Sequence, residues 1–347
     1  MHGTMVAAVL HRAGVLQVDE VPIPQIPPDG VLVRIRAVGI CGSDVHFYQD
    51  GRLGPFVVEK PFILGHESAG EIVEVGPEAK ALKVGTRVAI EPGIVCRKCR
   101  LCLSGRYNLC PNVDFLSAPP VDGVMCEYVA VPEQFAFPIP DSFSFRDGAM
   151  MEPLSVGVQA VLRARLRPGA TVAILGGGPI GLVTLAAARA AGAGKTIVAE
   201  RIPLRIETAK AFGASRVVDV EKESIAEVVA EETGGAMADY VFECAGSVPT
   251  ASMATDLAGR AATVAFVGWP GQREFPIKVE DVIDRELDLV GVNRYANTYP
   301  TAIALVADGR VDVSALVTHA FPLERVREAF DFVIEHKAET IKVVVEP

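Results

Sequence analysis

Residues 171–185 read TVAILGGGPIGLVTL: an apolar, strand-like run, a glycine-rich turn and the start of a helix-like run. Three glycines in this stretch, Gly176, Gly178 and Gly181, fit the spacing Gly-x-Gly-x-x-Gly. Such glycines let the backbone approach a pyrophosphate, and the following helix offers N–H groups and the positive end of its dipole. The stretch therefore predicts the first strand–turn–helix unit of a dinucleotide-binding α/β domain. The alternative is a glycine turn in an unrelated α/β domain.

An acidic residue stands where such a unit needs one. Glu200 closes the next strand-like run, KTIVAE (195–200), 24 residues after Gly176. A carboxylate there accepts hydrogen bonds from the adenosine ribose hydroxyls and would repel a 2′-phosphate, which favours NAD over NADP. Arg201 and Arg205 leave residual NADP use open, because an arginine can turn toward a phosphate. Arg205 can also line the adenosine pocket, and both arginines can simply be solvated surface charges.

Strand-like and helix-like runs alternate from about residue 149 onward, which implies a parallel sheet covered on both faces. The expected strands are 171–175, 195–200, 216–220, 239–244, 262–268 and 287–292. Residues 170–188 contain no charged side chain and could nominally span a bilayer, but the Gly176–Pro179 turn would break such a helix. A buried strand, a turn and a buried helix explain this stretch better.

The first 150 residues have a different pattern. Short alternating runs separated by turn signals predict half-buried strands at 31–40, 71–76, 84–90 and 127–132, in an all-β region with long loops. The last run, IKVVVE (341–346), has no obvious partner in the middle of the chain. A return of this strand to the first domain would make that domain discontinuous.

Composition narrows the function. A chain of 347 residues predicts two domains, and its net charge of −10, without a basic stripe, argues against nucleic-acid binding. Four of its seven cysteines lie in one cluster, unlike the framework of a secreted protein. The N-terminal apolar run, 5–10, is too short for a signal peptide. We expect a cytoplasmic protein with reduced thiols that acts on small molecules, with no membrane partner.

The cysteine cluster lies in VCRKCRLCLSGRYNLC (95–110). Its spacing, C-x2-C-x2-C-x7-C, fits a closed tetrahedral zinc site with four thiolates: Cys96, Cys99, Cys102 and Cys110. Such a site has no open position for a substrate. It is expected to hold together a loop that lacks a core of its own. Four free thiols placed by chance are the alternative.

A catalytic zinc needs about three protein ligands and one open position. Candidates are Cys41 in GICGSDVH, His66 and Glu67 in LGHESAG, and Glu152 in MEPLS. Spacing alone does not bring them together. Adjacent strand residues point to opposite faces, so His66 and Glu67 share a site only if Gly65 opens a turn. By chemistry alone, a structural role for His66 is the stronger interpretation.

Several motifs occur in a characteristic order: GICGSDVHFYQDGR, LGHESAGEIVEVG, EPGIVCRKCRLCLSGRYNLC, MEPLSVGV, the Gly176 turn and VGVNRYANTYPTAI. Together they resemble the zinc-dependent medium-chain dehydrogenase/reductase family, and within it the polyol branch of sorbitol and xylitol dehydrogenases. The resemblance runs from about residue 5 to about residue 345. It implies a GroES-like β-barrel catalytic domain, 1–153 and 293–347, and a Rossmann domain with a doubly wound parallel sheet, 154–292.

The resemblance also implies site residues. Cys41, His66 and Glu67 match the catalytic zinc ligands, and Glu152 matches a carboxylate beside the zinc that holds water or substrate. Whether Glu67 or Glu152 binds the metal directly stays open. Ser43 and His46 lie in the segment that often passes the proton out, although His46 can equally be a surface residue.

For the substrate and the cofactor, the resemblance points to a second set of positions. Arg294 and Tyr295 match a pair that contacts substrate hydroxyls, although Arg294 can also form an ordinary buried ion pair. Phe47 stands where the polyol branch often has tyrosine, with Tyr48 next, so one substrate hydrogen bond and the polyol preference are in doubt. Besides the glycines, the NAD-contacting positions are Ile180, Glu200, Arg205, Val267, Gly268, Trp269, Val292, Asn293 and Arg294.

The implied activity is the NAD-dependent oxidation of a polyol secondary alcohol to a ketose, like that of an L-iditol 2-dehydrogenase. The implied composition is two zinc ions per chain, one catalytic and one structural, in a homotetramer or homodimer. Alternatives within the family are dehydrogenases for simple secondary alcohols, butanediol or threonine. A non-enzymatic zinc–thiolate redox protein or dinucleotide-binding protein is an alternative from another class.

Overall fold

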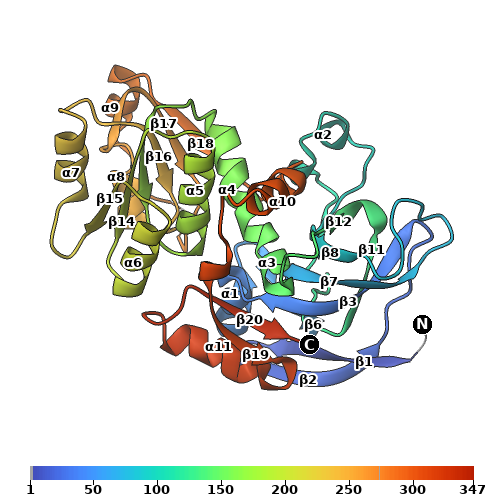
Figure 1. Ribbon diagram of the computed structural model, residues 1–347. Helices are drawn as coiled ribbons and strands as arrows, with labels where there is room; N and C mark the ends of the chain where they lie inside the picture. Colours follow the sequence, from blue (N-terminus) through green and yellow to red (C-terminus); the bar gives the residue numbers. More distant parts are fainter. Residues whose placement is uncertain (1–2, 273) are drawn as a thin grey trace. The chain divides into compact units, whose positions relative to one another are not determined.

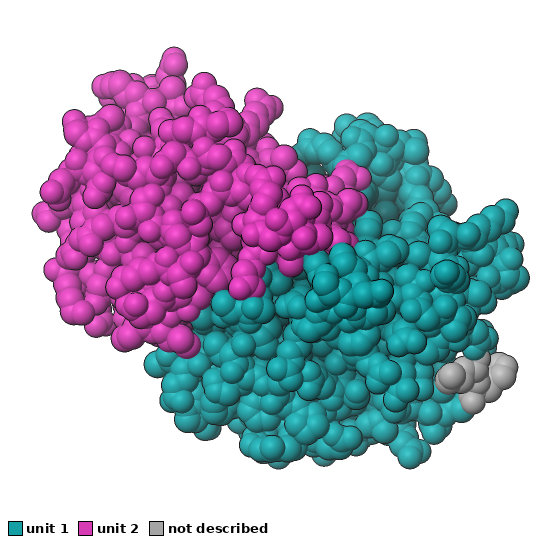
Figure 2. Space-filling model, viewed as in Figure 1, with its two compact units in different colours: residues 1–152, 313–347 teal, residues 153–312 magenta. Residues whose placement is uncertain are grey.

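The computed structural model describes residues 3–272 and 274–347. The chain divides into two compact units, one of residues 1–152 and 313–347 and the other of residues 153–312 (Figure 2). Within the described ranges, no helix has the length and apolar character required to cross a membrane.

The second unit is built on a six-stranded parallel sheet in the order β15-β14-β13-β16-β17-β18. Its strands are β13 (Thr171–Leu175), β14 (Lys195–Glu200), β15 (Arg216–Asp219), β16 (Ala238–Glu243), β17 (Ala258–Phe266) and β18 (Asp288–Gly291). The chain runs outward from β13 to one edge, then returns to the other side of β13. This is the order of a doubly wound dinucleotide fold, with its ligand crevice at the carboxyl ends of β13 and β16.

The helices of this unit are α4 (Met151–Ala164), α5 (Pro179–Ala190), α6 (Pro203–Ala211), α7 (Ile225–Glu232), α8 (Val248–Met253), α9 (Val279–Asp284) and α10 (Tyr299–Ala307). Helix α5 begins directly after the glycine turn, with Pro179 in its first turn, where a missing N–H costs nothing. Its residues 181–188, which are small or apolar except for Thr184, are all buried. The charge-free stretch 170–188 is thus a strand, a turn and a helix of a globular core.

The first unit contains a seven-stranded sheet in the order β12-β8-β7-β3-β20-β19, with β11 also paired to β3. These strands are β3 (Gly30–Gly39), β7 (Glu67–Val75), β8 (Arg87–Ile90), β11 (Tyr128–Pro132), β12 (Ala136–Pro138), β19 (Val317–Pro322) and β20 (Lys342–Glu346). In Figure 1, β20 from the end of the chain lies beside β3 from its beginning. Residues separated by three hundred positions therefore share one sheet.

A second sheet of this unit has the order β2-β1-β6, formed by β1 (Thr4–Arg12), β2 (Val15–Pro22) and β6 (Phe62–Ile63). Two-stranded pairs join β4 (Arg52–Leu53) to β5 (Phe56–Val57) and β9 (Gly93–Ile94) to β10 (Asp114–Phe115). The helices are α1 (Gly42–Asp50), α2 (Arg100–Leu103), α3 (Phe145–Ala149) and α11 (Val326–Glu335). The sequence analysis predicted neither α1 nor the β1–β2 hairpin. It placed the first strand of this region at residues 31–40 and assigned long loops between the strands.

The family resemblance implies a return to the first domain at residue 293, and this domain boundary stays a prediction. The second compact unit extends to Asp312. The reason is local packing: the Ala296 amide donates to Gln159 of α4, and the ring of Tyr295 packs edge-on against Tyr299 of α10. Residues 293–312 are thereby held to the second unit.

Candidate active site and cysteine lobe

Three potential metal ligands come together in the first unit. The ligand atoms of Cys41, His66 and Glu67 all lie within 4.8 Å of one another. Pairing of β3 with β7 sets Gly39 opposite Glu67, and Cys41 follows two residues after Gly39. Gly65 has φ +91, so the chain turns at the position where the sequence required it to turn. His66 and Glu67 therefore reach the same site although they are adjacent.

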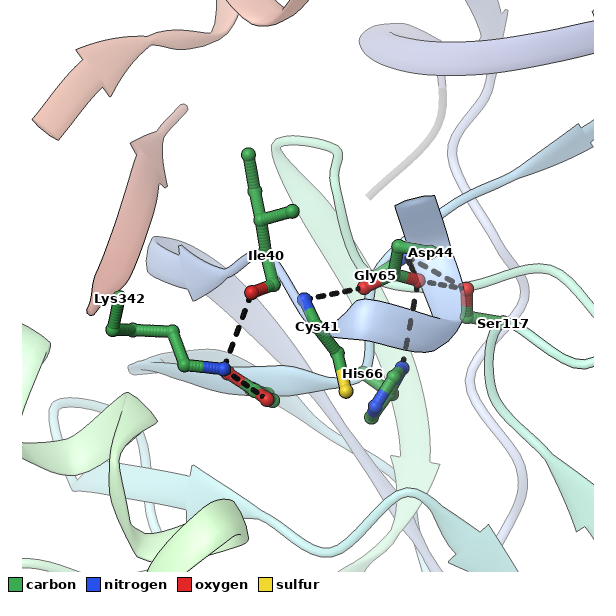
Figure 3. Close-up of polar contacts among 8 residues, drawn as sticks. Ile40, Cys41, Asp44, Gly65, His66, Ser117 and Lys342 are labelled. Carbon is green, nitrogen blue, oxygen red and sulfur yellow. Dashed lines mark hydrogen bonds and ion pairs between the residues drawn. The ribbon is translucent and has the colours of Figure 1, made fainter. Parts of the chain in front are cut away.

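A buried carboxylate, Asp44, organises these ligands from behind (Figure 3). It accepts hydrogen bonds from the Cys41 amide at 3.0 Å and the Gly65 amide at 3.2 Å. It also accepts one from Ser117 Oγ at 2.8 Å, and Ser117 itself accepts from the Gly65 amide. Burial alone would raise the pKa of Asp44, but His66 and these donors hold it below its ordinary value. Asp44 thus stays ionised in the interior.

Asp44 also faces the imidazole. Its Oδ1 lies 3.6 Å from His66 Nδ1, an ion-pair distance rather than a hydrogen bond. With Nδ1 turned to a carboxylate, Nε2 is the nitrogen left for a ligand role, as in carboxylate–histidine–metal arrangements. Thiolate, imidazole and carboxylate are the donors that zinc takes in proteins. The chemistry of this set therefore fits a zinc ion.

A buried lysine completes the cluster. The Lys342 ammonium donates to both Glu67 carboxylate oxygens, at 2.6 and 2.7 Å, and to the Ile40 carbonyl at 3.1 Å. The two side chains are 4% and 1% exposed. Burial alone would lower the pKa of Lys342, but the charges of Glu67 and Cys41 raise it above its ordinary value. Sequence reasoning missed Lys342, since only the pairing of β20 with β3 brings it to the site.

The other residues expected beside the three ligands, Glu152, Ser43 and His46, differ in burial. Glu152 is buried in the first turn of α4 but is not part of the three-residue donor set. Its charge is felt at Lys342, which places it close to the cluster. Ser43 is half-buried, and His46 is exposed, with Nδ1 3.0 Å from Asp50 Oδ2.

A further acid, Glu91, was not expected. It follows β8, is buried, and accepts a hydrogen bond from Tyr107 Oη at 3.2 Å. Burial raises the pKa of Glu91 to about 7, against the effect of Tyr107, and the charge of Glu152 acts in the same direction as burial. The only signal in the sequence was an isolated Glu-Pro-Gly turn at 91–93, which carries no chemistry by itself.

The four clustered cysteines form a second donor set. Neighbouring sulfur atoms of Cys96, Cys99, Cys102 and Cys110 are 3.4–3.9 Å apart. Zinc–sulfur bonds of about 2.3 Å in a tetrahedron place sulfurs about 3.8 Å apart, whereas a disulfide needs about 2.05 Å. Amides of Lys98 and Cys99 donate to Cys96 and lower the pKa of its thiol to about 6. The arrangement fits one tetrahedral zinc.

We call residues 93–115 the cysteine lobe. Cys99 caps helix α2, Cys102 lies within it, and this four-residue helix has no buried residue. Besides the β9–β10 pair, Arg97 donates to Asp29 at 2.6 Å and Tyr107 donates to Glu91. At the base of the lobe, the Phe115 ring lies 5.5 Å from the ring of His66. The lobe therefore contacts the three-ligand site through Phe115, and its helix α2 contributes no buried residue to a core.

The glycine turn in the second unit has the form of a phosphate cradle. Gly176 has φ +96, and a Cβ on Gly181 would overlap the Gly176 carbonyl oxygen. Gly178 precedes α5 without a side-chain cap. The first amides of α5 are therefore not covered by a side chain, as an anion at a helix N-terminus requires. The turn fits the pyrophosphate of a dinucleotide.

Glu200 lies beside this turn with its carboxylate already engaged. It accepts hydrogen bonds from the Gly177 amide at 2.9 Å and from the amides of Arg201 and Ile202 at 2.7 and 3.0 Å. Arg205 Nη1 is 3.6 Å from the position that a Cβ on Gly178 would take, whereas Arg201 is exposed. Arg205 therefore approaches the turn.

The remaining residues expected to contact the cofactor or the substrate differ in burial. Ile180, Val267, Gly268 and Val292 are half-buried near the carboxyl ends of strands, and Asn293 and Trp269 are exposed. Arg294 has φ +52, an uncommon backbone for a non-glycine residue. Tyr295 is buried.

Phe47 lies elsewhere than a substrate contact would suggest. Its side chain is 1% exposed and belongs to the core of the first unit, with its ring edge-on to Phe62 at 5.8 Å. The next residue, Tyr48, donates to Asp331 at 2.9 Å, so its hydroxyl is taken up by α11. A substrate-contacting role for Phe47 stays a prediction.

Comparisons with known proteins agree with this architecture. Residues 27–141 match the family model described as alcohol dehydrogenase GroES-like domain, and residues 179–308 match the model described as zinc-binding dehydrogenase. The chain is 46% identical to a sorbitol dehydrogenase from Bacillus subtilis, covering 99% of this chain and 97% of the relative. It is 41% identical to a putative D-xylulose reductase from Rhizobium meliloti, covering 98% of each.

A solved structure is also similar over nearly the full length. It is a putative zinc-binding dehydrogenase from Sinorhizobium meliloti bound to NADP, with 34% identity, a TM-score of 0.91, and 99% of this chain and 100% of that chain covered. The chain belongs to the zinc-dependent medium-chain dehydrogenase/reductase family, in the branch of the polyol dehydrogenases. It is an oxidoreductase that works with zinc and a nicotinamide cofactor, and the predicted fold class is confirmed.

Proposed function

We propose that this chain oxidises a secondary hydroxyl of a polyol such as sorbitol or xylitol, with NAD as the hydride acceptor and a ketose as the product. The observation that carries the proposal is the convergence of Cys41, His66 and Glu67 within 4.8 Å. The identity of 46% to a sorbitol dehydrogenase supports a polyol as the substrate.

The clustered side chains of the first unit would each have a part in this chemistry. Cys41, His66 and Glu67 would hold zinc, which when bound lowers the pKa of a coordinated substrate hydroxyl. Asp44 fixes the orientation of the imidazole and of the Cys41 backbone. Lys342 offsets the negative charge of Glu67, so the donor set need not carry an unbalanced carboxylate.

The proton released by the substrate has a short route outward. Ser43 is half-buried at the start of α1, and His46 is exposed on the same helix. Glu152 would hold a water molecule or a substrate hydroxyl beside the donor set, in line with its burial and its proximity to Lys342. Asp50 Oδ2 lies 3.0 Å from His46 Nδ1 and would hold the imidazole in place on α1.

The second unit would hold the cofactor. The glycine turn would receive the pyrophosphate, and Glu200 would repel a 2′-phosphate, which supports NAD as the preferred cofactor. The three amide donors of Glu200 keep its charge at the turn. Arg205, the arginine that approaches Gly178, would supply residual affinity for NADP. Arg294 and Tyr295 would bind substrate hydroxyls, because a guanidinium and a phenol offer several donors and one acceptor.

A substrate panel tests the proposal. With NAD and the zinc-loaded protein, we expect kcat/KM for sorbitol or xylitol to exceed that for 2,3-butanediol and threonine by at least about tenfold, since unpaired polar groups in a site built for hydroxyls are costly. The rate is followed as NADH absorbance, and NADP in place of NAD serves as the cofactor control. Activity on butanediol or threonine without activity on any polyol would contradict the proposal and favour that alternative within the family.

Metal content tests the second donor set. We expect two zinc ions per chain, and one after Cys99 and Cys102 are both replaced with serine, because the remaining two thiolates cannot close a tetrahedral site. Elemental analysis measures the count, and limited proteolysis is expected to cut first within the cysteine lobe, which has no core. Replacing Cys126 and Cys244, which belong to neither donor set, is the control and should leave two zinc ions.

We further propose that the chain assembles into a homotetramer or homodimer in the cytoplasm. Strand β18 ends its sheet with β17 as its partner, and neighbouring α9 exposes Val279 and Ile283, the latter 72% exposed. An unpaired edge beside apolar side chains favours burial against another copy. None of the seven cysteines, all within the described residues, forms a disulfide, as a reducing compartment allows.

A further inference from the structure

Glu243 is a buried acid to which the proposed chemistry gives no role. It is the last residue of β16, opposite Leu175 of β13 and Phe266 of β17 in the parallel sheet. Its side chain is 1% exposed. A buried carboxylate is costly unless it has hydrogen-bond partners, so its contacts indicate what it holds in place.

The Glu243 side chain folds the following loop back on itself. Its Oε1 accepts hydrogen bonds from the amides of Ala245 at 3.0 Å and Gly246 at 2.9 Å, and from Thr250 Oγ1 at 2.7 Å. Thr250 lies on α8, so one oxygen atom ties the strand end, the loop and the helix together. The amides of Ala245 and Gly246 would lose this acceptor if the carboxylate were removed, whereas Thr250 Oγ1 could still donate to the Ser247 carbonyl at 3.0 Å.

The Glu243 main chain holds a second segment. Its carbonyl oxygen accepts from the amides of Val267 at 2.8 Å and Gly268 at 2.9 Å. Gly268 packs so closely against Gly246 that an added Cβ would overlap the Gly246 amide nitrogen. The loop fixed by the side chain and the segment fixed by the carbonyl therefore interlock.

The same loop also contacts the glycine turn. A Cβ on Gly176 would lie 3.0 Å from both the amide nitrogen and the Cβ of Ala245. Ala245 is thus wedged between the turn on one side and Glu243 on the other. The segments that follow β13, β16 and β17 therefore meet around Glu243 and the loop that its carboxylate holds, at the edge of the sheet where doubly wound folds bind their ligands.

We infer that Glu243 is a positioning residue of the dinucleotide site, which sets the Gly176 turn and the 267–269 segment at the spacing that NAD(H) requires. The inference rests on the proposed cofactor and deepens it, since Glu243 itself need not touch the ligand. It implies that an acceptor oxygen is required at this place, whereas a full negative charge is not. Burial raises the pKa of Glu243, in opposition to its hydrogen bonds, which agrees with tolerance of a neutral acceptor.

The chain carries its own reporter for this site. Trp269 is the one tryptophan of the sequence, it is 58% exposed, and it follows Gly268 directly. Titration with NADH, followed by quenching of Trp269 fluorescence, gives a Kd without any turnover. We expect Glu243→Leu to raise this Kd at least about tenfold, because the Ala245 and Gly246 amides lose their acceptor and Thr250 loses its link to β16, and Glu243→Gln to stay within about threefold of the wild type.

Controls separate positioning from general destabilisation. Glu232→Leu removes a carboxylate paired with Lys195, the first residue of β14, at the opposite edge of the sheet, and should leave the Kd unchanged. A folded Glu243→Leu protein that binds NADH as tightly as the wild type would overturn the inference, as would failure of Glu243→Gln to restore binding. If Glu243→Leu does not fold, Thr250→Val decides instead: an unchanged Kd in that folded variant overturns the inference.

The wild-type arm distinguishes this inference from the proposed function. If the wild type shows no NADH-dependent change in Trp269 fluorescence and no binding by calorimetry, the proposed cofactor is wrong, and the role of Glu243 falls with it. If the wild type binds and Glu243→Leu binds equally well, only the role of Glu243 is wrong.

Discussion

Replacing Cys41 with serine is expected to lower the rate of polyol oxidation by about 1,000-fold and to reduce the zinc content from two ions per chain to one. The sulfur of Cys41 is one of three donors within 4.8 Å, and a serine hydroxyl is a poor substitute for a thiolate at neutral pH. Loss of a metal that stabilises charge by several kcal/mol corresponds to a rate loss of this size. Elemental analysis and steady-state kinetics with NAD measure both effects.

A matched control exists in the same unit. Cys126 is also buried and free, but its sulfur donates to the Tyr128 carbonyl and belongs to neither donor set. Cys126→Ser should retain both zinc ions and most of the activity. An undiminished rate for Cys41→Ser would show that the reaction does not depend on this cluster and would sink the proposed mechanism.

Replacing Lys342 with methionine is expected to lower the free energy of unfolding by about 3–5 kcal/mol, because it strands a buried carboxylate without its partner. The ammonium holds both Glu67 oxygens and also satisfies the Ile40 carbonyl, so three contacts are lost together. The effect should be largest after chelation, when no metal can compensate Glu67. Urea unfolding of the chelated protein gives the number.

Two comparisons make this test specific. Lys210→Met breaks an exposed pair with Glu207 on α6 and should change the free energy of unfolding by less than about 1 kcal/mol. Adding Glu67→Gln to Lys342→Met should recover a large part of the lost stability, since no charge is then left unpaired. Equal effects of Lys342→Met and Lys210→Met would contradict the buried ion pair.

Local patterns predicted the parts of the fold that depend on neighbours in the sequence. The glycine turn, the strand before it and the acidic residue after it appear as expected, because steric needs of the turn fix residue types at short spacing. The same holds for the four cysteines, whose sulfur atoms come together as their close spacing predicts. In both cases the residues that form the site lie within about thirty positions of one another in the sequence.

Long-range pairing decided the rest. Cys41 and Glu67 meet through the register of β3 against β7, and Lys342 joins them through β20, which no local pattern specifies. Asp44 was visible in the GSDVH motif but carried no signal of its role, because its partner Ser117 is 73 residues away. Phe47 shows what a motif does not specify: its place in the motif points to the substrate, the structure packs its ring in the core, and the substrate contact stays a prediction.

The position of β20 has a consequence for how the protein is made. Residues 153–312 form an uninterrupted stretch that carries its own sheet and core, so this unit can fold before residues 313–347 have been added. The first unit cannot complete its sheet until residues 342–346 have emerged and inserted between β3 and β19. Lys342 therefore reaches Glu67 only after the second unit has been synthesised, and a chain that lacks β20 would leave Cys41, His66 and Glu67 on an incomplete sheet.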